Sequence, residues 1–129
     1  MKSFCYRPLT CETAEDFRAV VIDRFGAKES WLVDRLLSNP ALGSDRQAGV
    51  IAYDEYEQPI CVLGAIPRRA IFEGKEVSVL NFGTMAIRKG VPRETLLPEI
   101  VRQVVSLFSN SILEFSNTAS PGAFNRLMQ

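Results

Sequence analysis

The stretch that decides the fold covers residues 79–101 and reads "VLNFGTMAIRKGVPRETLLPEIV". Its first half is an apolar run, which predicts a buried strand, and its second half has apolar residues at helical spacing, which predicts an amphipathic helix. Two basic residues, a glycine and a proline separate the halves. A short turn from a strand into a helix directs free backbone N–H groups toward one point, where many folds hold a phosphate. The stretch is therefore a candidate anion-binding turn.

The predicted helix covers about residues 93–108, because one apolar stripe runs along it. The stripe consists of Leu96, Leu97, Ile100, Val101, Val104, Val105 and Phe108. Pro98 lies within this range and has no N–H to donate. Proline is tolerated in the first turn of a helix, so we expect the regular helix to begin near Thr95 or Leu96.

Upstream of this stretch, the sequence predicts three strands joined by short turns. The strands cover residues 49–54, 60–72 and 76–87, and the second is expected to be interrupted near Gly64 or Pro67. A polar turn over 55–59 and a tight turn over 73–75, with glycine in its centre, separate them. Turns this short join antiparallel neighbours, so the three strands should form an antiparallel meander.

The remaining segments complete one predicted domain over residues 1–129. A short strand is expected over 3–9, a helix starting at Thr10 or Thr13 and stopping at Gly26, and a helix over 29–38. A short strand over 112–115 and a final short helix follow. The order β-α-α-β-β-β-α-β-α predicts an α/β (α+β) fold with a mixed, mostly antiparallel sheet. The passage from 80 to 115 should be a right-handed crossover between parallel strands.

Composition excludes several classes of protein. The chain has 129 residues, 47% of them hydrophobic and 23% charged, as in ordinary globular domains. Its formal net charge is zero, which argues against binding a nucleic-acid backbone. No apolar run approaches the roughly 18 residues of a membrane span, and the N-terminus lacks a signal-peptide pattern. A cytoplasmic protein that binds neither nucleic acid nor membrane is expected.

Histidine is absent, and this restricts the chemistry more than any other compositional feature. Ser–His–Asp and Cys–His catalysis and histidine-rich zinc sites are excluded, so no metal is expected. The three cysteines, Cys5, Cys11 and Cys61, are an odd number and are expected to be free thiols. Cys61 lies in a predicted strand and should be a small buried apolar residue.

The order of elements resembles the GCN5-related N-acetyltransferase (GNAT) superfamily. The opening "YRPLTCETAEDFRAV" resembles that family's first strand and acidic helix start, and "GVIAYDEYEQPICVLGAIP" resembles its second and third strands. "VLNFGTMAIRKG" is similar to the fourth strand. "ILEFSNTASPGAFNRLM" is similar to the fifth strand and the Asn-x-x-Ser stretch and helix that follow it.

The resemblance implies transfer of an acyl group from acetyl-CoA, as co-substrate, to an unidentified small-molecule or peptide amine. Exposed backbone at Met85, Ala86 and Ile87 would hold the pantetheine arm, although apolar strand residues are also ordinary core. The helix N-terminus at Arg93, Glu94 and Thr95 would hold the pyrophosphate. Arg88, Lys89 and Arg93 would add positive charge, and the alternative is that they are solvated basic residues on a turn.

Further site residues implied by the resemblance lie near the end of the chain. Glu114, beside the expected substrate cleft, would be the general base, unless it faces solvent on the polar side of its strand. Asn117 and Ser120 match the Asn-x-x-Ser stretch and would meet the cofactor arm, although helix capping explains them equally well. Tyr53 and Tyr56 would be a general acid or a substrate wall, or simply packing residues.

Two departures from the family's pattern leave a second function open. The family's CoA-binding loop has glycines near the positions where this chain has Arg93, Thr95 and Leu97, and the family's usual last two strands are expected to be absent. The chain therefore resembles a shortened or truncated member. The alternative to an enzyme is a non-catalytic module of the same fold that binds a small ligand or a protein partner. An exposed sheet edge also predicts a homodimer.

Overall fold

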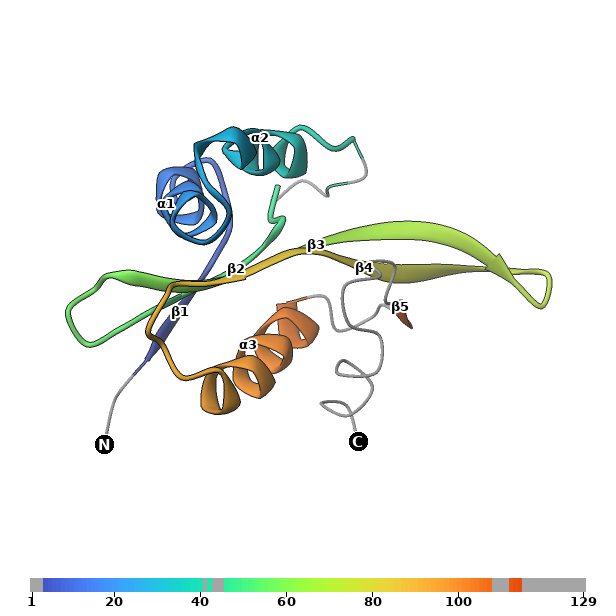
Figure 1. The fold of residues 1–129 in the computed structure, drawn as a ribbon. Helices are drawn as coiled ribbons and strands as arrows, with labels where there is room; N and C mark the ends of the chain where they lie inside the picture. Colours follow the sequence, from blue (N-terminus) through green and yellow to red (C-terminus); the bar gives the residue numbers. More distant parts are fainter. Residues whose placement is uncertain (1–3, 41, 43–45, 108–111, 115–129) are drawn as a thin grey trace.

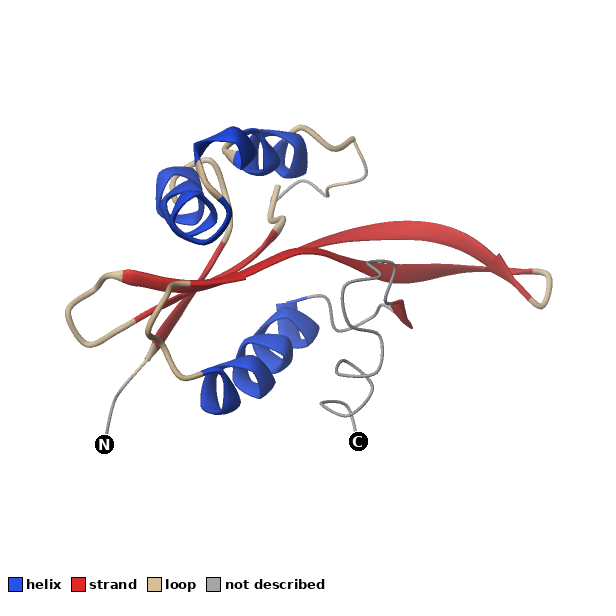
Figure 2. Ribbon diagram, in the orientation of Figure 1, coloured by secondary structure: helices blue, strands red, loops and turns tan. Residues whose placement is uncertain are grey.

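A computed structural model of the chain describes residues 4–40, 42, 46–107 and 112–114. Among these residues, five strands form one sheet in the order β1-β2-β3-β4-β5. Helices α1 (Ala14–Phe25) and α2 (Trp31–Leu37) lie on one face of the sheet, and α3 (Arg93–Leu107) lies on the other (Figures 1 and 2). The predicted α+β class with a mixed, mostly antiparallel sheet is confirmed.

The central strands form the predicted antiparallel meander. β2 (Gly49–Tyr53) pairs with β3 (Pro59–Phe72), and β3 pairs with β4 (Lys75–Ile87). The turn between β3 and β4 consists of Glu73 and Gly74, whose φ angles of 51° and 76° are both positive, as the tightest hairpin turns require. β3 and β4 extend well beyond the helices as a two-stranded arm (Figure 1).

The two outer strands are short. β1 (Cys5–Pro8) pairs antiparallel with β2, and β5 (Ile112–Glu114) pairs with residues 79–81 of β4. The β4–β5 pair is parallel, which confirms the predicted strand–helix–strand crossover through α3. The predicted final helix lies outside the described residues.

Two apolar cores lie on opposite faces of the sheet because successive strand residues point to opposite sides. Ile51 and Tyr53 of β2 belong to the core beneath α1 and α2, whereas Val50 and Ala52 belong to the core beneath α3. β2 is therefore buried along its whole length. The stripe predicted for α3 is confirmed in its central residues, since Leu96, Ile100, Val101 and Val104 are buried.

Two predictions of element boundaries were wrong, and a third was right only in part. α3 begins at Arg93, so Pro98 lies inside the helix and only the carbonyl of Glu94 loses its helical partner. α2 covers only Trp31–Leu37, because a separate turn of 3₁₀ helix (Ala27–Glu29) precedes it. The predicted irregularity of β3 near Gly64 is confirmed as a shift of register between Leu63 and Ala65. The strand is continuous through Pro67, which is tolerated because β2 pairs with β3 only as far as Gly64.

No helix in the described ranges is long and apolar enough to cross a membrane.

Candidate functional site

A pocket of about 390 Å³ lies where β4 ends and the chain turns into α3. Five of the residues predicted for cofactor binding line it together, namely Met85, Ala86, Ile87, Arg88 and Arg93. Glu94 and Thr95 lie on the same exposed first turn of α3 but do not line the pocket. Asn117 and Ser120 lie outside the described residues, and of Glu114 only the backbone is described, paired with Asn81.

The register of β4 shows which backbone groups face away from β3. The Arg88 N–H donates to the Ile60 carbonyl at 2.8 Å, so this opposite pair is a hydrogen-bonded one. Hydrogen-bonded pairs alternate along antiparallel strands, so Ala86, opposite Val62, is again bonded to β3. The N–H and C=O groups of Met85 and Ile87 therefore point to the other side. The described part of β5 pairs with β4 only at residues 79–81, well before this segment.

Asp23 of α1 holds the turn that follows β4. Its carboxylate accepts the backbone N–H of Lys89 at 3.1 Å and lies 3.7 Å from the Arg88 guanidinium. The Arg88 Nε also donates to the Pro59 carbonyl at 2.9 Å. Gly90 then adopts a φ of 86°, which glycine tolerates better than other residues. Asp23 therefore partly neutralises the charge of Arg88, and the Arg88 side chain also ties the turn to the start of β3. The sequence alone did not indicate this structural role.

The N-terminus of α3 is exposed and has no serine, threonine or aspartate cap, because Pro92 precedes it. The first N–H groups of a helix have no partner within the helix and carry partial positive charge. Arg93 and Thr95, at positions where the family pattern has glycine, are exposed, and Leu97 packs against the core beneath α3. The first turn of α3 is therefore open to solvent, and an anion bound there would meet both its free N–H groups and the Arg93 guanidinium.

Sequence reasoning missed two residues of this pocket, Arg24 and Phe25, at the end of α1. The Arg24 guanidinium lies 5.7 Å from the centre of the Phe25 ring, and Phe25 is 47% exposed, which is unusual for so large an apolar side chain. No motif marks these residues. They reach β4 only because α1 packs across the sheet.

Two more pockets continue from the first along the α1–α2 face of the sheet. A pocket of about 380 Å³ is lined by Phe25, Glu29, Leu32 and Thr84, and so shares Phe25 with the first. A third, of about 390 Å³, shares Leu32 and Thr84 with the second and lies between α2 and the β3–β4 arm. We call these three adjoining pockets the trough.

A β-bulge shapes the middle of the trough. Leu63 pairs with Met85 and Ala65 pairs with Phe82, so Gly64 alone faces both Gly83 and Thr84. A bulge of this kind bends its strand and redirects side chains. Leu36 of α2 covers Gly64 so closely that an added Cβ would lie 2.8 Å from the Leu36 side chain. With this bulge and the close packing of α2, Thr84 lines both the second and the third pocket of the trough.

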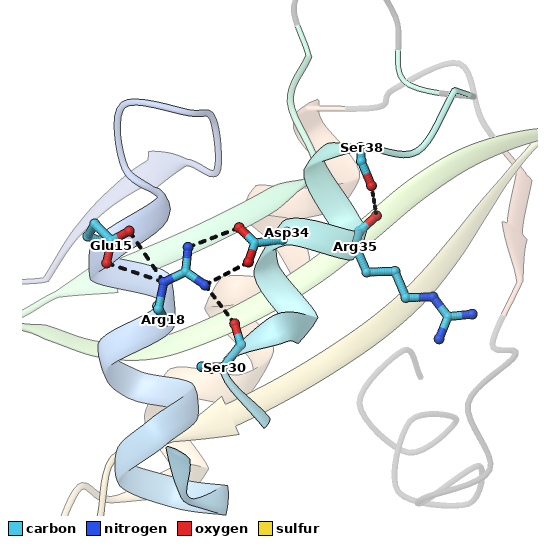
Figure 3. A network of polar contacts seen from close by, with 6 residues as sticks. All are labelled: Glu15, Arg18, Ser30, Asp34, Arg35 and Ser38. Atoms are coloured by element: carbon cyan, nitrogen blue, oxygen red, sulfur yellow. Dashed lines mark hydrogen bonds and ion pairs between the residues drawn. The ribbon is translucent and has the colours of Figure 1, made fainter. Parts of the chain in front are cut away.

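Arg18 fixes α2 against α1 beside the trough (Figure 3). Its guanidinium donates to the Ser30 carbonyl at 2.7 Å and to both carboxylate oxygens of Asp34 at 3.0 and 3.1 Å, and it also contacts Glu15. These hydrogen bonds hold the pKa of Asp34 below its ordinary value. The network joins α1, the start of α2 and its first turn into one wall.

Two other candidate residues are not poised for chemistry. Burial raises the pKa of the Cys61 thiol to about 12, so it stays protonated near neutral pH and is a buried apolar residue, as predicted. Tyr53 is 2% exposed, and its hydroxyl donates to Asp16 at 2.7 Å. Burial and this bond raise the pKa of Tyr53. Tyr53 is therefore a core residue, and Tyr56, which is 75% exposed, lies on the turn before β3.

No protein-family model matches the sequence, and no curated protein matches it. Solved structures do match. The chain is similar to a GNAT family N-acetyltransferase from Escherichia coli (YhbS) in complex with CoA, at a TM-score of 0.74 and 18% identity, covering 98% of this chain and 68% of that one. A GNAT family acetyltransferase from Brucella melitensis in complex with acetyl-CoA has a TM-score of 0.69 and 17% identity, covering 96% and 80%.

A third similar structure is a protein of unknown function from Enterococcus faecalis V583, described as a probable N-acyltransferase. It has a TM-score of 0.68 and 16% identity, and the match covers 98% of this chain but only 31% of that protein. The chain therefore has the fold of the GNAT superfamily, as its sequence predicted. This is a fold on which similar proteins bind CoA and acetyl-CoA.

Proposed function

We propose that this chain transfers an acyl group from acyl-CoA, acetyl-CoA being the simplest case, to an amine. The observation that carries the proposal is the trough. It joins a basic turn and a helix N-terminus to a segment of β4 whose backbone groups face away from β3. It continues through the second pocket to the third, between α2 and the β3–β4 arm. A donor and an acceptor can therefore reach the same strand from opposite ends.

The chain's own residues fit an acyl-CoA by charge and backbone. Arg24, Arg88, Lys89 and Arg93 line the pocket at the turn, and Asp23 offsets one of these four charges. The remaining positive charge, together with the helix N-terminus, suits a pyrophosphate. The outward N–H and C=O groups of Met85 and Ile87 suit the amides of a pantetheine arm. When bound, the thioester supplies an activated acyl carbon.

The reaction needs a group that removes a proton from the acceptor. The acceptor nitrogen forms a bond to the acyl carbon as the carbon–sulfur bond breaks, with release of a thiolate that takes up one proton. The nitrogen loses one proton in return, and a carboxylate or a water chain must receive it. Glu29 lines the middle pocket of the trough, between the other two, and is our first candidate for this base. Glu114, on β5, is the second.

The test is to titrate CoA and acetyl-CoA into the protein by calorimetry and thermal shift. A ligand that binds only the native state raises the melting temperature. Absence of a shift at millimolar CoA would refute the proposal. If CoA binds, Glu29→Gln and Glu114→Gln are compared with wild type by release of free thiol in the presence of an amine. The variant that lacks the base should lose turnover while retaining its affinity for CoA.

The non-catalytic alternative is favoured by one observation. Asp23 already occupies the Lys89 N–H, one of the turn's backbone donors. CoA binding without thiol release for any amine tested would favour a binding module over an enzyme.

We also propose a homodimer. In the described sheet, β1 is an edge strand of four residues, and the β3–β4 arm has no β2 partner beyond Gly64. Exposed edges of this kind are commonly covered by another chain. Size-exclusion chromatography with light scattering should show a dimer, and a single monomeric species across micromolar concentrations would refute this proposal.

A further inference from the structure

The end of the trough farthest from the basic turn is a pocket between α2 and the β3–β4 arm. Its volume of about 390 Å³ is within the range for small-molecule sites. Leu32, Leu36 and Ile66 form its apolar part. Ile66 and Arg68 lie two residues apart on β3 and therefore share the face of the arm that meets α2.

Among the described residues, the charged ones that line this pocket are Arg35 and Arg68, and none of the described lining residues is a carboxylate. Within the described residues, neither guanidinium forms an ion pair with a carboxylate, whereas the nearby Arg18 and Arg69 do, with Asp34 at 3.0 Å and Glu76 at 3.2 Å. Arg35 lies over the Trp31 ring at 5.6 Å, and Figure 3 shows its side chain directed away from the Arg18 network. Within the part of the chain that the structure describes, no carboxylate therefore offsets the positive charge of this pocket.

We propose that this pocket recognises an acceptor amine through an anionic group, a carboxylate or a phosphate, held by Arg35 and Arg68. The inference rests on the proposed function, since it assigns the acceptor class to the second half of the same trough. Guanidinium groups bind both anions through paired N–H donors, and they bind best beside an apolar wall that excludes water. An acceptor anchored there would extend its amine past Thr84 toward Glu29, in the pocket that adjoins this one.

The experiment compares amines that differ only in the anionic group. β-Alanine is compared with its amide, and phosphoethanolamine with ethanolamine, each titrated into the full chain and followed by calorimetry and by NMR. The variants are Arg35→Gln and Arg68→Gln, and Arg35→Lys keeps the charge without the paired donors. Arg69→Gln is the matched control, because Arg69 adjoins Arg68 on β3, is not a lining residue of this pocket, and pairs with Glu76. CoA affinity is measured for every variant.

We expect the acid to bind about tenfold more tightly than its neutral counterpart, from one charge-assisted hydrogen-bonded pair. Arg35→Gln and Arg68→Gln should each remove most of this preference, Arg35→Lys should retain part of it, and Arg69→Gln should leave it unchanged. The better of the two acids identifies the anion as carboxylate or phosphate. CoA affinity should be the same in all variants.

Failure of this inference differs from failure of the proposed function. If CoA binds and both members of each pair bind equally, the anionic acceptor is refuted and acyl transfer stands. If CoA does not bind but the acids bind in an Arg35-dependent manner, acyl transfer is refuted and the anion site stands. An equal loss in Arg69→Gln would show a general effect of surface charge and would also refute the assigned site.

Discussion

Reversing the charge of Arg93 tests the basic turn directly. Arg93 lines the pocket at the start of α3, is exposed, and has no ion pair with any described carboxylate, so Arg93→Glu changes the local charge by two without breaking an ion pair of the described residues. Four cations and Asp23 leave a charge of about three at this pocket, and the variant would leave about one. The binding of a polyanion such as CoA should weaken accordingly.

The magnitude follows from Coulomb's law. At about 6 Å in water, two unit charges interact by about 0.7 kcal/mol, and screening at physiological ionic strength reduces this to about 0.3 kcal/mol. A change of two charges acting on a pyrophosphate of about two negative charges therefore costs about 1.3 kcal/mol. This corresponds to roughly tenfold weaker binding. Because the interaction is screened, the loss should shrink toward zero in 1 M salt.

Calorimetric titration of CoA into wild type and Arg93→Glu at low and high salt measures this loss. Lys75→Glu is the control, because it makes the same change in net charge at the tip of the β3–β4 arm (Figure 1). Along a strand of 13 residues, that tip lies roughly 40 Å from the turn. Equal CoA affinity in wild type and Arg93→Glu would show that the turn does not bind the pyrophosphate of CoA. An equal loss in both variants would show that only net charge matters.

Three further predictions concern the scaffold of the site. Gly49→Ala should lower the free energy of unfolding by at least about 1–3 kcal/mol in urea titrations, because φ is 145° and the new Cβ would lie 2.3 Å from the Leu63 carbonyl; an unchanged midpoint would contradict this. Arg18→Ala should cost about 1–2 kcal/mol by losing its charged hydrogen bond to the Ser30 carbonyl, and wild-type stability in the same assay would refute it. The pKa of Asp34 is lowered in the folded state, so the stability that its carboxylate contributes is present above its unfolded pKa and is lost as the pH falls through its folded pKa. In Asp34→Asn, the free energy of unfolding should therefore fall less steeply with decreasing pH below about pH 4 than in wild type.

The part of the site that was predictable from sequence is a continuous segment. Met85 to Arg88 and Arg93 lie together because a strand, a turn and a helix start follow one another in the chain, and local patterns report such neighbours. The family's glycine pattern also predicts side chains where that pattern has bare backbone, and two of them, Arg93 and Thr95, are exposed. It carried no information on whether charge replaces that backbone.

The residues that sequence reasoning missed come from other elements. Arg24, Phe25 and Glu29 precede the turn by about 60 positions, and no motif links them to β4. The same holds for Asp23, whose carboxylate meets the Lys89 N–H across 66 positions. Single-sequence patterns describe neighbours along the chain, so they cannot report contacts that exist only after α1 packs on the sheet.

The order of elements, the antiparallel meander, the Glu73–Gly74 turn and the α3 stripe follow from the sequence alone, because periodicity and turn chemistry act over a few residues. The continuity of β3 past Pro67, the Gly83–Thr84 bulge and the joining of three pockets into one trough depend on tertiary structure. Each depends on how elements that are distant in the sequence pack together. Leu36 of α2 packs against Gly64 of β3, and Phe25 of α1 lines a pocket with residues of β4. Local sequence therefore determines the elements of this protein, whereas packing between distant elements determines its site.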